Sequence, residues 1–370
     1  MLEKSLTEIL SEFVLETHYD NLPNFTKKIT KLSLLDFFGS TIAGSNTKAG
    51  KIFIKTFEDF GCKNGEATII GNGYKTSVAD AAFINGGCCH ILELDDIHKA
   101  STVHPAAPII PAALAIAEKL SLNGNGLIEA IVVGYDVAIR IGEAVNPSHY
   151  YYWHNTATCG TFGAAAAAGK VLNLTKDELV DALGNAGSIA AGLWEFLRDG
   201  AMTKHLHPAN AAKNGLTVST LAKNGFTGAK YILEGEKGFF KAMAKGINKD
   251  ATTNGLGKKY KIEENGFKLY PSCRHSHPGI DATLKIKEKY NLMPADIEKI
   301  KIKTYSAALN IAGNLKPKTS YEAKFSLPYC VAATLIFGKL NLSHFKEEII
   351  ADEKIKNLIN KIEIEVDKDF

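Results

Sequence analysis

The most constraining feature of this sequence is a set of segments built almost entirely from glycine, alanine and other small residues. They cover residues 160–169, 186–192 and 209–213. Small side chains on a helix allow two backbones to approach closely, because the distance between packed helices is set by the side chains at the contact. We therefore expect these segments to lie inside a tightly packed helical domain.

Apolar periodicity predicts helices over the first 245 residues or so. Apolar residues recur at spacings of three and four residues over 6–14 and again from Leu34 to Ile42, as the buried face of an amphipathic helix requires. One short strand-like piece lies at 67–71. The remaining helices are expected at 46–60, 77–92, 106–121, 125–144, 156–173, 176–191, 208–224 and 236–245.

The composition and pattern of the sequence change after about residue 255, where lysine becomes frequent and β-branched residues alternate with charged ones. Strands are expected at 297–305 and 362–366, with helices at 278–290, 319–337 and 349–360. This pattern predicts a mainly α protein, with a large all-helical domain at 1–255 and a smaller α+β domain at 256–370. The sequence stops at Phe370, directly after a strand. We expect the smaller domain to be incomplete in this sequence.

The charge balance argues against two classes of partner. The chain has 43 basic and 40 acidic residues, a formal net charge of +3, which gives no reason to expect nucleic acid or a membrane surface as a partner. The longest apolar run, 105–117, contains three prolines and is too short to span a bilayer. Any attraction for an anion must therefore be local, in a pocket.

The N-terminus and the cysteines constrain the cellular location. The first ten residues mix charges and lack the apolar core of a signal peptide. None of the six cysteines forms a CxxC pair, and Cys88 and Cys89 are adjacent, which suits neither a zinc ribbon nor an ordinary disulfide framework. Phosphate-loop and dinucleotide-binding motifs are absent. We expect a cytoplasmic protein with reduced thiols.

Candidate chemistry gathers in four segments that place ionisable side chains beside glycine, proline or small residues. The first, 93–105, packs three carboxylates and two histidines into thirteen residues between two expected helices. Such a loop can supply a general base and a carboxylate that orients it. The alternative is that Asp95 or Asp96 caps a helix and the histidines are exposed to solvent.

The other three segments are 150–161, 203–213 and 267–278. His154 stands at the start of a small-residue helix whose N-terminal amides can bind an anion, or it is a structural histidine in an aromatic cluster. Lys204 is either an ordinary exposed lysine or a buried one, which would be costly unless it meets an anion. Lys268 and Arg274 belong either to a site or to a basic connector between domains.

Together these segments offer histidines for proton transfer, carboxylates to orient the histidines, and lysine and arginine side chains to bind the anionic groups of a substrate. Such a set suits abstraction of a proton α to a carboxylate, followed by loss of water, loss of CO₂ or reprotonation. The residues do not choose among these outcomes.

Metal binding is the rival hypothesis, and it would make the protein a metal-dependent hydrolase. His205 with His207, or His275 with His277, can act as ligands, completed by Asp95 or Asp96. No HExxH pattern appears, and the neighbouring lysines and arginine would repel a cation. We therefore expect no metal.

In these same residues the chain resembles the MmgE/PrpD family, which includes 2-methylcitrate dehydratase, cis-aconitate decarboxylase and iminodisuccinate epimerase. The resemblance runs from about residue 24 to the end and rests on many blocks in the same order. They are 35–44, 67–71, 90–105, 134–142, 153–154 followed by 160–166, 204–212, 268–271, 280–282 and 322–329.

The resemblance implies a large all-helical domain, a smaller α+β domain and a homodimer. It also implies a cofactor-free site in the cleft between the domains, with a small polycarboxylate as substrate. The catalytic residues that it implies are His104, His154, Asp95 and Tyr329. The substrate-binding residues that it implies are Lys204, Lys268, Arg274, Glu93, Asp96 and Cys273.

The chain departs from the family pattern at several of these positions. Decarboxylase-like members carry aspartate and threonine in place of Glu93 and Ile97, and histidine in place of Cys273. The loop 97–104 also lacks the tryptophan-containing version typical of 2-methylcitrate dehydratases. We expect a lyase or isomerase, with a 2-methylcitrate dehydratase-like hydro-lyase ahead of an iminodisuccinate epimerase-like isomerase. The alternatives are a cis-aconitate decarboxylase-like enzyme and a catalytically inactive family member.

Overall fold

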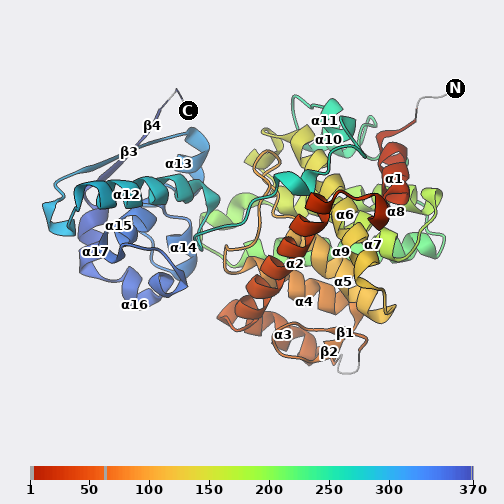
Figure 1. Ribbon diagram of the computed structural model, residues 1–370, viewed down its shortest axis with the longest axis horizontal. Coiled ribbons are helices and arrows are strands. Elements are labelled where there is room, and N and C mark those ends of the chain that lie inside the picture. The colour runs from red at the N-terminus through yellow and green to blue at the C-terminus, as the bar shows by residue number, and fades with distance from the viewer. Residues whose placement is uncertain (1–3, 62–64, 368, 370) are drawn as a thin grey trace. The chain divides into compact units, whose positions relative to one another are not determined.

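The computed structural model describes residues 4–61, 65–367 and 369, and the chain divides into two units (Figure 1). The first unit holds the chain up to Ile91, then Asp95–Trp194 and Thr203–Phe267. The second holds Leu92–Leu94, Glu195–Met202 and the chain from Lys268 onward. The main division thus falls after Phe267.

In its described residues the first unit forms helices and one small hairpin, which confirms the mainly α fold class. Helix α7 packs against α5, α6, α8 and α9, and α2 lies over α4 (Figure 1). The elements are α1 (Leu6–Glu16), α2 (Asn24–Ser45), α3 (Lys48–Asp59), β1 (Ala67–Thr68), β2 (Lys75–Thr76), α4 (Val78–His90), α5 (Ala106–Lys119), α6 (Gly124–Val145), α7 (Asn155–Val171), α8 (Lys176–Ile189), α9 (Thr203–Lys223), α10 (Phe239–Met243) and α11 (Asp250–Thr253).

The small-residue segments bring helix backbones into close contact, as their composition predicts. A Cβ atom on Gly163 of α7 would lie 2.5 Å from the carbonyl oxygen of Gly134 on α6. A Cβ atom on Gly215 of α9 would lie 2.5 Å from the Cβ of Ala164. Both distances are shorter than atoms can tolerate, so only glycine allows α7 to pack this closely against its two neighbours.

We expect Gly163→Ala to lower the free energy of unfolding by about 1–3 kcal/mol, because the added methyl group must push two helix backbones apart. Gly39→Ala on α2 is the matched control, since nothing lies within 4 Å of a Cβ atom there. The control should gain up to about 1 kcal/mol from better helix propensity. Thermal and urea unfolding of both variants measure the difference, and equal effects would contradict the close-packing interpretation.

Helix α2 buries the face opposite to the one predicted from its apolar spacing. Leu35 and Ile42 are 69% and 48% exposed, whereas Thr30, Thr41 and Gly44 are buried. A Cβ atom on Gly44 would lie 2.0 Å from the carbonyl oxygen of Cys88 on α4, so the contact has room only for small residues. The predicted burial of the apolar stripe is therefore wrong for these residues.

Several hydroxyl groups on the buried face of α2 donate to carbonyl oxygens of the same helix, whereas that of Thr26 donates to Glu263. Thr30 Oγ1 donates to the carbonyl oxygen of Thr26 at 2.8 Å, and Thr41 Oγ1 donates to that of Phe37 at 2.6 Å. A buried hydroxyl without a partner would be costly, and these bonds avoid that cost.

In the described part of the chain, no helix combines the length and apolar character needed to cross a membrane.

The second unit combines helices with a two-stranded parallel sheet. Strand β3 pairs with β4 from Ile300 opposite Ile362 to Thr304 opposite Val366, which confirms the predicted strands. On the exposed side of the sheet, Lys301 Nζ forms an ion pair with Glu365 Oε2 at 2.9 Å. The elements are α12 (His277–Tyr290), β3 (Ile300–Thr304), α13 (Ser306–Ala312), α14 (Ser320–Lys324), α15 (Leu327–Phe337), α16 (Glu347–Ile350), α17 (Glu353–Ile359) and β4 (Ile362–Val366).

The single helix predicted at 319–337 is wrong, because α14 ends at Lys324 and α15 begins at Leu327. Ser326 is the N-cap of α15, and its hydroxyl accepts the backbone N–H of Tyr329 at 3.1 Å. Pro328 follows in the first turn, where its missing N–H costs nothing but where it prevents the preceding residues from continuing a helix. The helix predicted at 349–360 is likewise divided into α16 and α17.

Candidate active site

The loop 95–105 of the first unit connects to α5 and is held in place by backbone hydrogen bonds. Ile97 and Gly266 exchange two of these bonds, each 2.9 Å long. Within the loop, the backbone N–H of His98 donates to the carbonyl oxygen of Val103, also at 2.9 Å. The loop is therefore a fixed structural element that can hold side chains in a defined geometry.

Asp96 organises this loop through its side chain. Its Oδ1 accepts the backbone N–H of Ala106 at the start of α5, and its Oδ2 accepts the hydroxyl of Tyr135 at 2.7 Å and the amide of Asn265 at 2.6 Å. Burial raises the pKa of Asp96 to about 8, and the charge of Asp36 adds to the effect. Both carboxylate oxygens are thus engaged inside the protein, and the helix-capping interpretation holds for Asp96.

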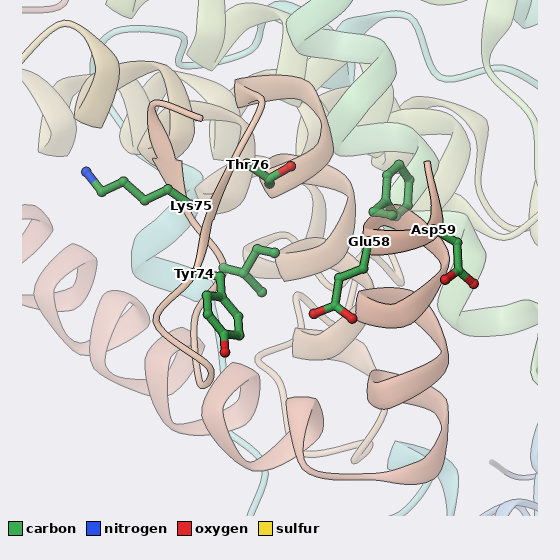
Figure 2. Close-up of a pocket in the computed structure, with 7 residues that line it drawn as sticks. Glu58, Asp59, Tyr74, Lys75 and Thr76 are labelled. Carbon is green, nitrogen blue, oxygen red and sulfur yellow. The ribbon is translucent and has the colours of Figure 1, made fainter. Parts of the chain in front are cut away.

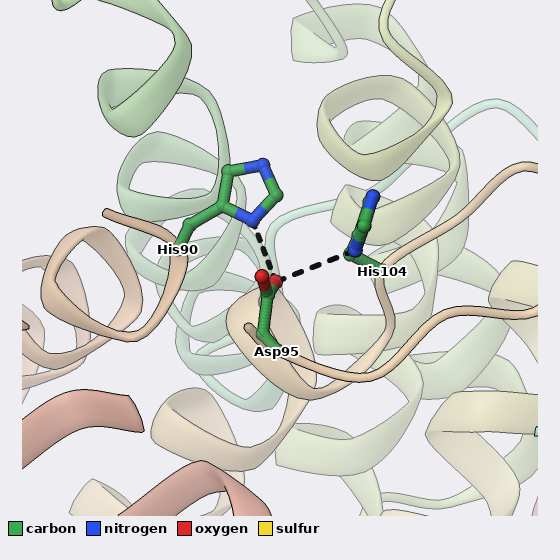
Figure 3. A group of neighbouring side chains, drawn as sticks. All are labelled: His90, Asp95 and His104. Atoms are coloured by element: carbon green, nitrogen blue, oxygen red, sulfur yellow. Dashed lines mark hydrogen bonds and ion pairs between the residues drawn. The ribbon is translucent and has the colours of Figure 1, made fainter. Parts of the chain in front are cut away.

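Asp95 lies between two histidine rings, and all three side chains are buried (Figure 3). His90, the last residue of α4, has its Nδ1 2.6 Å from Asp95 Oδ2, and His104 has its Nδ1 3.6 Å from the same oxygen. The ring centroids of the two histidines are 4.9 Å apart. Because His98 and His104 are only 1% and 7% exposed, the alternative that the histidines of this loop face solvent is wrong.

The position of the proton on neutral His104 follows from its hydrogen bonds. Its Nδ1 is 2.7 Å from the carbonyl oxygen of Asp96, which can only accept, so Nδ1 carries the proton. The lone pair of neutral His104 is then on Nε2, where it can act as a base. The backbone N–H of His104 also donates to Thr156 Oγ1 at 3.0 Å, which fixes the residue against the first turn of α7.

His154 precedes the first residue of α7 and faces a second histidine. Its Nδ1 is 3.1 Å from the Nδ1 of His207 on α9, and its ring stacks 5.5 Å from that of His90. Burial lowers the pKa of His154 well below its ordinary value, and the charges of His207 and Lys204 add to the effect. Burial and Lys204 lower the pKa of His207 to about 4.

The backbone around Gly192 holds His154 in this position. The N–H of His154 donates to the carbonyl oxygen of Gly192 at 2.9 Å. Gly192 has φ 147°, and a Cβ atom there would lie 2.6 Å from the Cβ of Ala157. Trp194 covers His154 with its ring centroid 4.7 Å away, and its indole N–H donates to the carbonyl oxygen of Trp153. Position 192 therefore requires glycine, both for its backbone conformation and because a side chain would collide with Ala157.

Lys204 lies in the first turn of α9 and is only 2% exposed. The interpretation of this residue as an ordinary exposed loop lysine is therefore wrong. Burying an ammonium group is costly, and an anionic partner reduces that cost. Lys204 lies one helical turn before His207, so α9 places a cation and an imidazole on the same face.

The second unit contains the other predicted residues, beginning with a buried ion pair. Lys268 Nζ lies 3.2 Å from Glu93 Oε2 and donates to the carbonyl oxygen of Glu93 at 3.0 Å. Glu93 has φ 57°, a left-handed conformation that is uncommon for a residue with a side chain. The two side chains are 1% or less exposed, so the pair is fully removed from solvent.

The remaining predicted residues of the second unit differ in exposure. Cys273 is buried, with its N–H donating to the carbonyl oxygen of Lys324 at 2.9 Å, whereas Arg274 is exposed. Tyr329 is fully buried in the core of this unit, and its hydroxyl donates to the carbonyl oxygen of His344. Burial raises the pKa of Tyr329.

Comparison with known proteins identifies the family. The sequence model of the MmgE/PrpD N-terminal domain matches residues 8–251, and that of the MmgE/PrpD C-terminal domain matches residues 270–370. The chain belongs to the MmgE/PrpD family.

The chain is similar in sequence to several named enzymes. A cis-aconitate decarboxylase of Aspergillus terreus is 29% identical over 350 residues, covering 89% of this chain and 71% of that protein. The cis-aconitate decarboxylase of Homo sapiens is 27% identical, covering 100% of this chain and 78% of that protein. The 2-methylcitrate dehydratase of Salmonella typhimurium is 24% identical, and the match covers 80% of this chain and 64% of that protein. This MmgE/PrpD chain is an enzyme of the lyase or isomerase class.

Sequence reasoning assigned no role in proton transfer to two histidines of this candidate site: His90 lay in a block of the resemblance, and His207 was considered only as a metal ligand. The signal for His90 was its position five residues before Asp95, at the end of an expected helix. The signal for His207 was its spacing of three from Lys204. Each becomes part of the site only through a partner on another element.

The histidine arrangement favours proton transfer over metal binding. His90, Asp95 and His104 lie close enough to share an ion, but Nδ1 of His104 carries a proton that it donates to Asp96. His98, Glu143 and Glu264 also gather, yet Lys261 Nζ lies 2.9 Å from Glu143 and supplies the cation there. Among the described residues, neither His205 with His207 nor His275 with His277 belongs to such a group.

One hollow of the first unit lies elsewhere, between the end of α3 and the β1–β2 hairpin (Figure 2). Its volume is about 570 Å³, and it is lined by Glu58, Asp59 and Tyr74, among others, with no histidine. Its one lysine, Lys75, is already 3.0 Å from Glu118. These side chains lack the paired acid and base groups that the histidine cluster provides.

Proposed function

We propose that this protein removes a proton α to a carboxylate of a small di- or tricarboxylic acid, using its own side chains without a cofactor. The leading reaction is elimination of water, as in a 2-methylcitrate dehydratase-like hydro-lyase. The observation that carries the proposal is the fixed tautomer of His104, which leaves the lone pair of the neutral ring on Nε2. A neutral imidazole of this kind suits a general base near neutral pH.

In the proposed reaction, His104 Nε2 takes the proton from the carbon α to a carboxylate. The C–H electrons form the new C=C bond, and the neighbouring C–O bond breaks. The leaving hydroxyl takes a proton from His154 and departs as water. Lys204 binds a substrate carboxylate, and Asp95 stabilises the charge that develops on His104 from 3.6 Å.

Asp96 holds in place the loop that carries Asp95 and His104. The resemblance to the family also implies Lys268, Arg274, Glu93 and Cys273 as substrate-binding residues, and these belong to the proposal on that ground. The relatives favour a second candidate, decarboxylation of cis-aconitate, because those that bear this name match at 27–29% identity against 23–26% for the dehydratases. Glu93, Ile97 and Cys273, which differ from the residues of decarboxylase-like members, count against decarboxylation.

Proton NMR in D₂O distinguishes these reactions. The purified protein is incubated separately with 2-methylcitrate, citrate, cis-aconitate and iminodisuccinate. We expect deuterium at an α-carbon of 2-methylcitrate or citrate, with an alkene product. Release of CO₂ from cis-aconitate selects decarboxylation, and exchange in iminodisuccinate without an alkene selects epimerisation. The proposal is contradicted by a folded protein that exchanges no substrate proton.

A further inference from the structure

Two buried histidines face each other through the same ring atom, and this contact requires a proton between them. The Nδ1 atoms of His154 and His207 are 3.1 Å apart, and both rings are almost fully buried. Two lone pairs at this distance would repel, so one nitrogen must donate and the other accept. The Nε2 atom of each ring points away from this shared proton.

We propose that His154 and His207 act as one acid–base group that takes up a single proton when a polycarboxylate binds. His207 is the positioning residue of the pair, and this role rests on the proposed function. In the empty site the pair holds two protons, one between the Nδ1 atoms and one on an outer Nε2. A third proton makes the pair cationic, with one proton shared and one on each Nε2.

The proton balance of the proposed reaction follows from this arrangement. His154 gives its Nε2 proton to the leaving hydroxyl, and the shared proton moves onto His154 Nδ1. His154 and His207 are then both neutral, with the remaining proton of His207 on Nε2. No imidazolate forms at any step, which a lone neutral histidine acting as an acid would require.

The charges around the pair explain why proton uptake should depend on the ligand. The groups that act on His154 are His207, Lys204, His90 and His104, and in the empty site the charged form of each disfavours a cation on His154. A di- or tricarboxylate brings two or three negative charges and reverses this balance, since an opposite charge favours the charged form. Sharing the added proton between two rings spreads the positive charge.

His149 provides the contrast within the same region. Its ring is also buried, but its Nε2 contacts Thr158 Oγ1 at 2.7 Å and its Nδ1 contacts the carbonyl oxygen of Met243 at 3.1 Å. Neither neighbour can take up a proton near neutral pH. His149 is therefore a structural histidine, and His149→Gln is a matched control for a change at His207.

Calorimetry with a non-reactive tricarboxylate tests the inference. Tricarballylate has no hydroxyl to lose, and its binding heat in buffers of different ionisation enthalpy gives the number of protons taken up. We expect uptake of about one proton at pH 7.5 by wild type and His149→Gln, and clearly less by His207→Asn. Asparagine places an amide where Nδ1 was, so it keeps a hydrogen-bond partner for His154 but cannot be protonated.

The possible results distinguish a failure of the shared histidine pair from a failure of the proposed function. Equal proton uptake by wild type and His207→Asn overturns the shared pair while leaving the proposed substrate class standing. No binding of tricarballylate or any substrate by wild type contradicts the proposed function itself. If His207→Asn does not fold, NMR of wild type labelled with ¹⁵N-histidine decides. Added ligand should shift two coupled rings toward the protonated form, and a shift of one ring alone overturns the pair.

Kinetics give a second readout that a purely structural role would not move. We expect His207→Asn to lower kcat by about 10²-fold with KM changed little, because general acid catalysis contributes on this scale. The pH at which kcat is half-maximal should also shift. An unchanged pH profile with activity lost only in proportion to folded protein would overturn the proposal.

Discussion

His104→Asn should lower kcat by a factor of about 10²–10⁴ while the melting temperature stays near that of wild type. Asparagine can still donate a hydrogen bond to the carbonyl oxygen of Asp96, the contact that His104 Nδ1 makes at 2.7 Å. The substitution deletes Nε2, the nitrogen on which the neutral ring carries its lone pair. Substrate deuterium exchange and thermal unfolding measure the two effects.

His98→Asn is the matched control, since His98 lies in the same loop and is 1% exposed. Its Nδ1 contacts Ser101 Oγ at 3.0 Å and its Nε2 contacts Glu264 at 3.3 Å, so its ring is used within the protein. We expect this variant to lose stability without losing kcat per folded molecule. If His104→Asn instead loses activity only in proportion to its stability, His104 is structural and the proposed base is wrong.

Local patterns in the sequence were sufficient to predict the long helices of the first unit, but not which face of each helix is buried. The segments 160–169 and 209–213 fall within α7 and α9, because small residues suit helices that cross closely. Helix α2 shows where this reasoning fails. Its apolar stripe was expected inside, yet α4 approaches so closely at Gly44 that no side chain fits there, and apart from Phe37 the buried residues of α2 are glycine, serine and threonine.

The candidate site was predicted as far as local clustering of titratable residues allows. His104, His154 and Lys204 stood out because each lies beside the start of a helix. His207 was considered only as a metal ligand, because the contact that suggests proton transfer is with His154, 53 residues earlier in the chain. That contact exists only because α7 and α9 pack together.

Asp96 shows the opposite difficulty, because local clustering does not reveal how a carboxylate is used. The sequence places it beside Asp95 in a loop dense with ionisable groups. In the structure its two oxygens accept hydrogen bonds from α5, from Tyr135 and from Asn265, which join separate parts of the first unit. These partners are 10, 39 and 169 residues away, so no sequence window could have contained them all.

Lys204→Met should raise KM by about 10–100-fold and change kcat much less, because it removes a charge-assisted contact to a substrate carboxylate. Methionine has nearly the length of lysine and suits a site that is 2% exposed, so the fold should remain intact. Steady-state kinetics on whichever polycarboxylate shows exchange measure the effect. An unaltered KM would count against this role.

The same variant should also change the pH dependence of kcat/KM. The charge of Lys204 lowers the pKa of both His154 and His207, so its removal should raise both values. Because the elimination needs the pair in its protonated form, loss of this proton produces the basic limb of kcat/KM, and a raised pKa moves that limb to higher pH. Lys213→Met is the matched control on α9, since Lys213 pairs with Asp80 at 3.0 Å near the surface. That control should leave KM and the basic limb unchanged, so a shift in both variants would show that the effect comes from α9 as a whole.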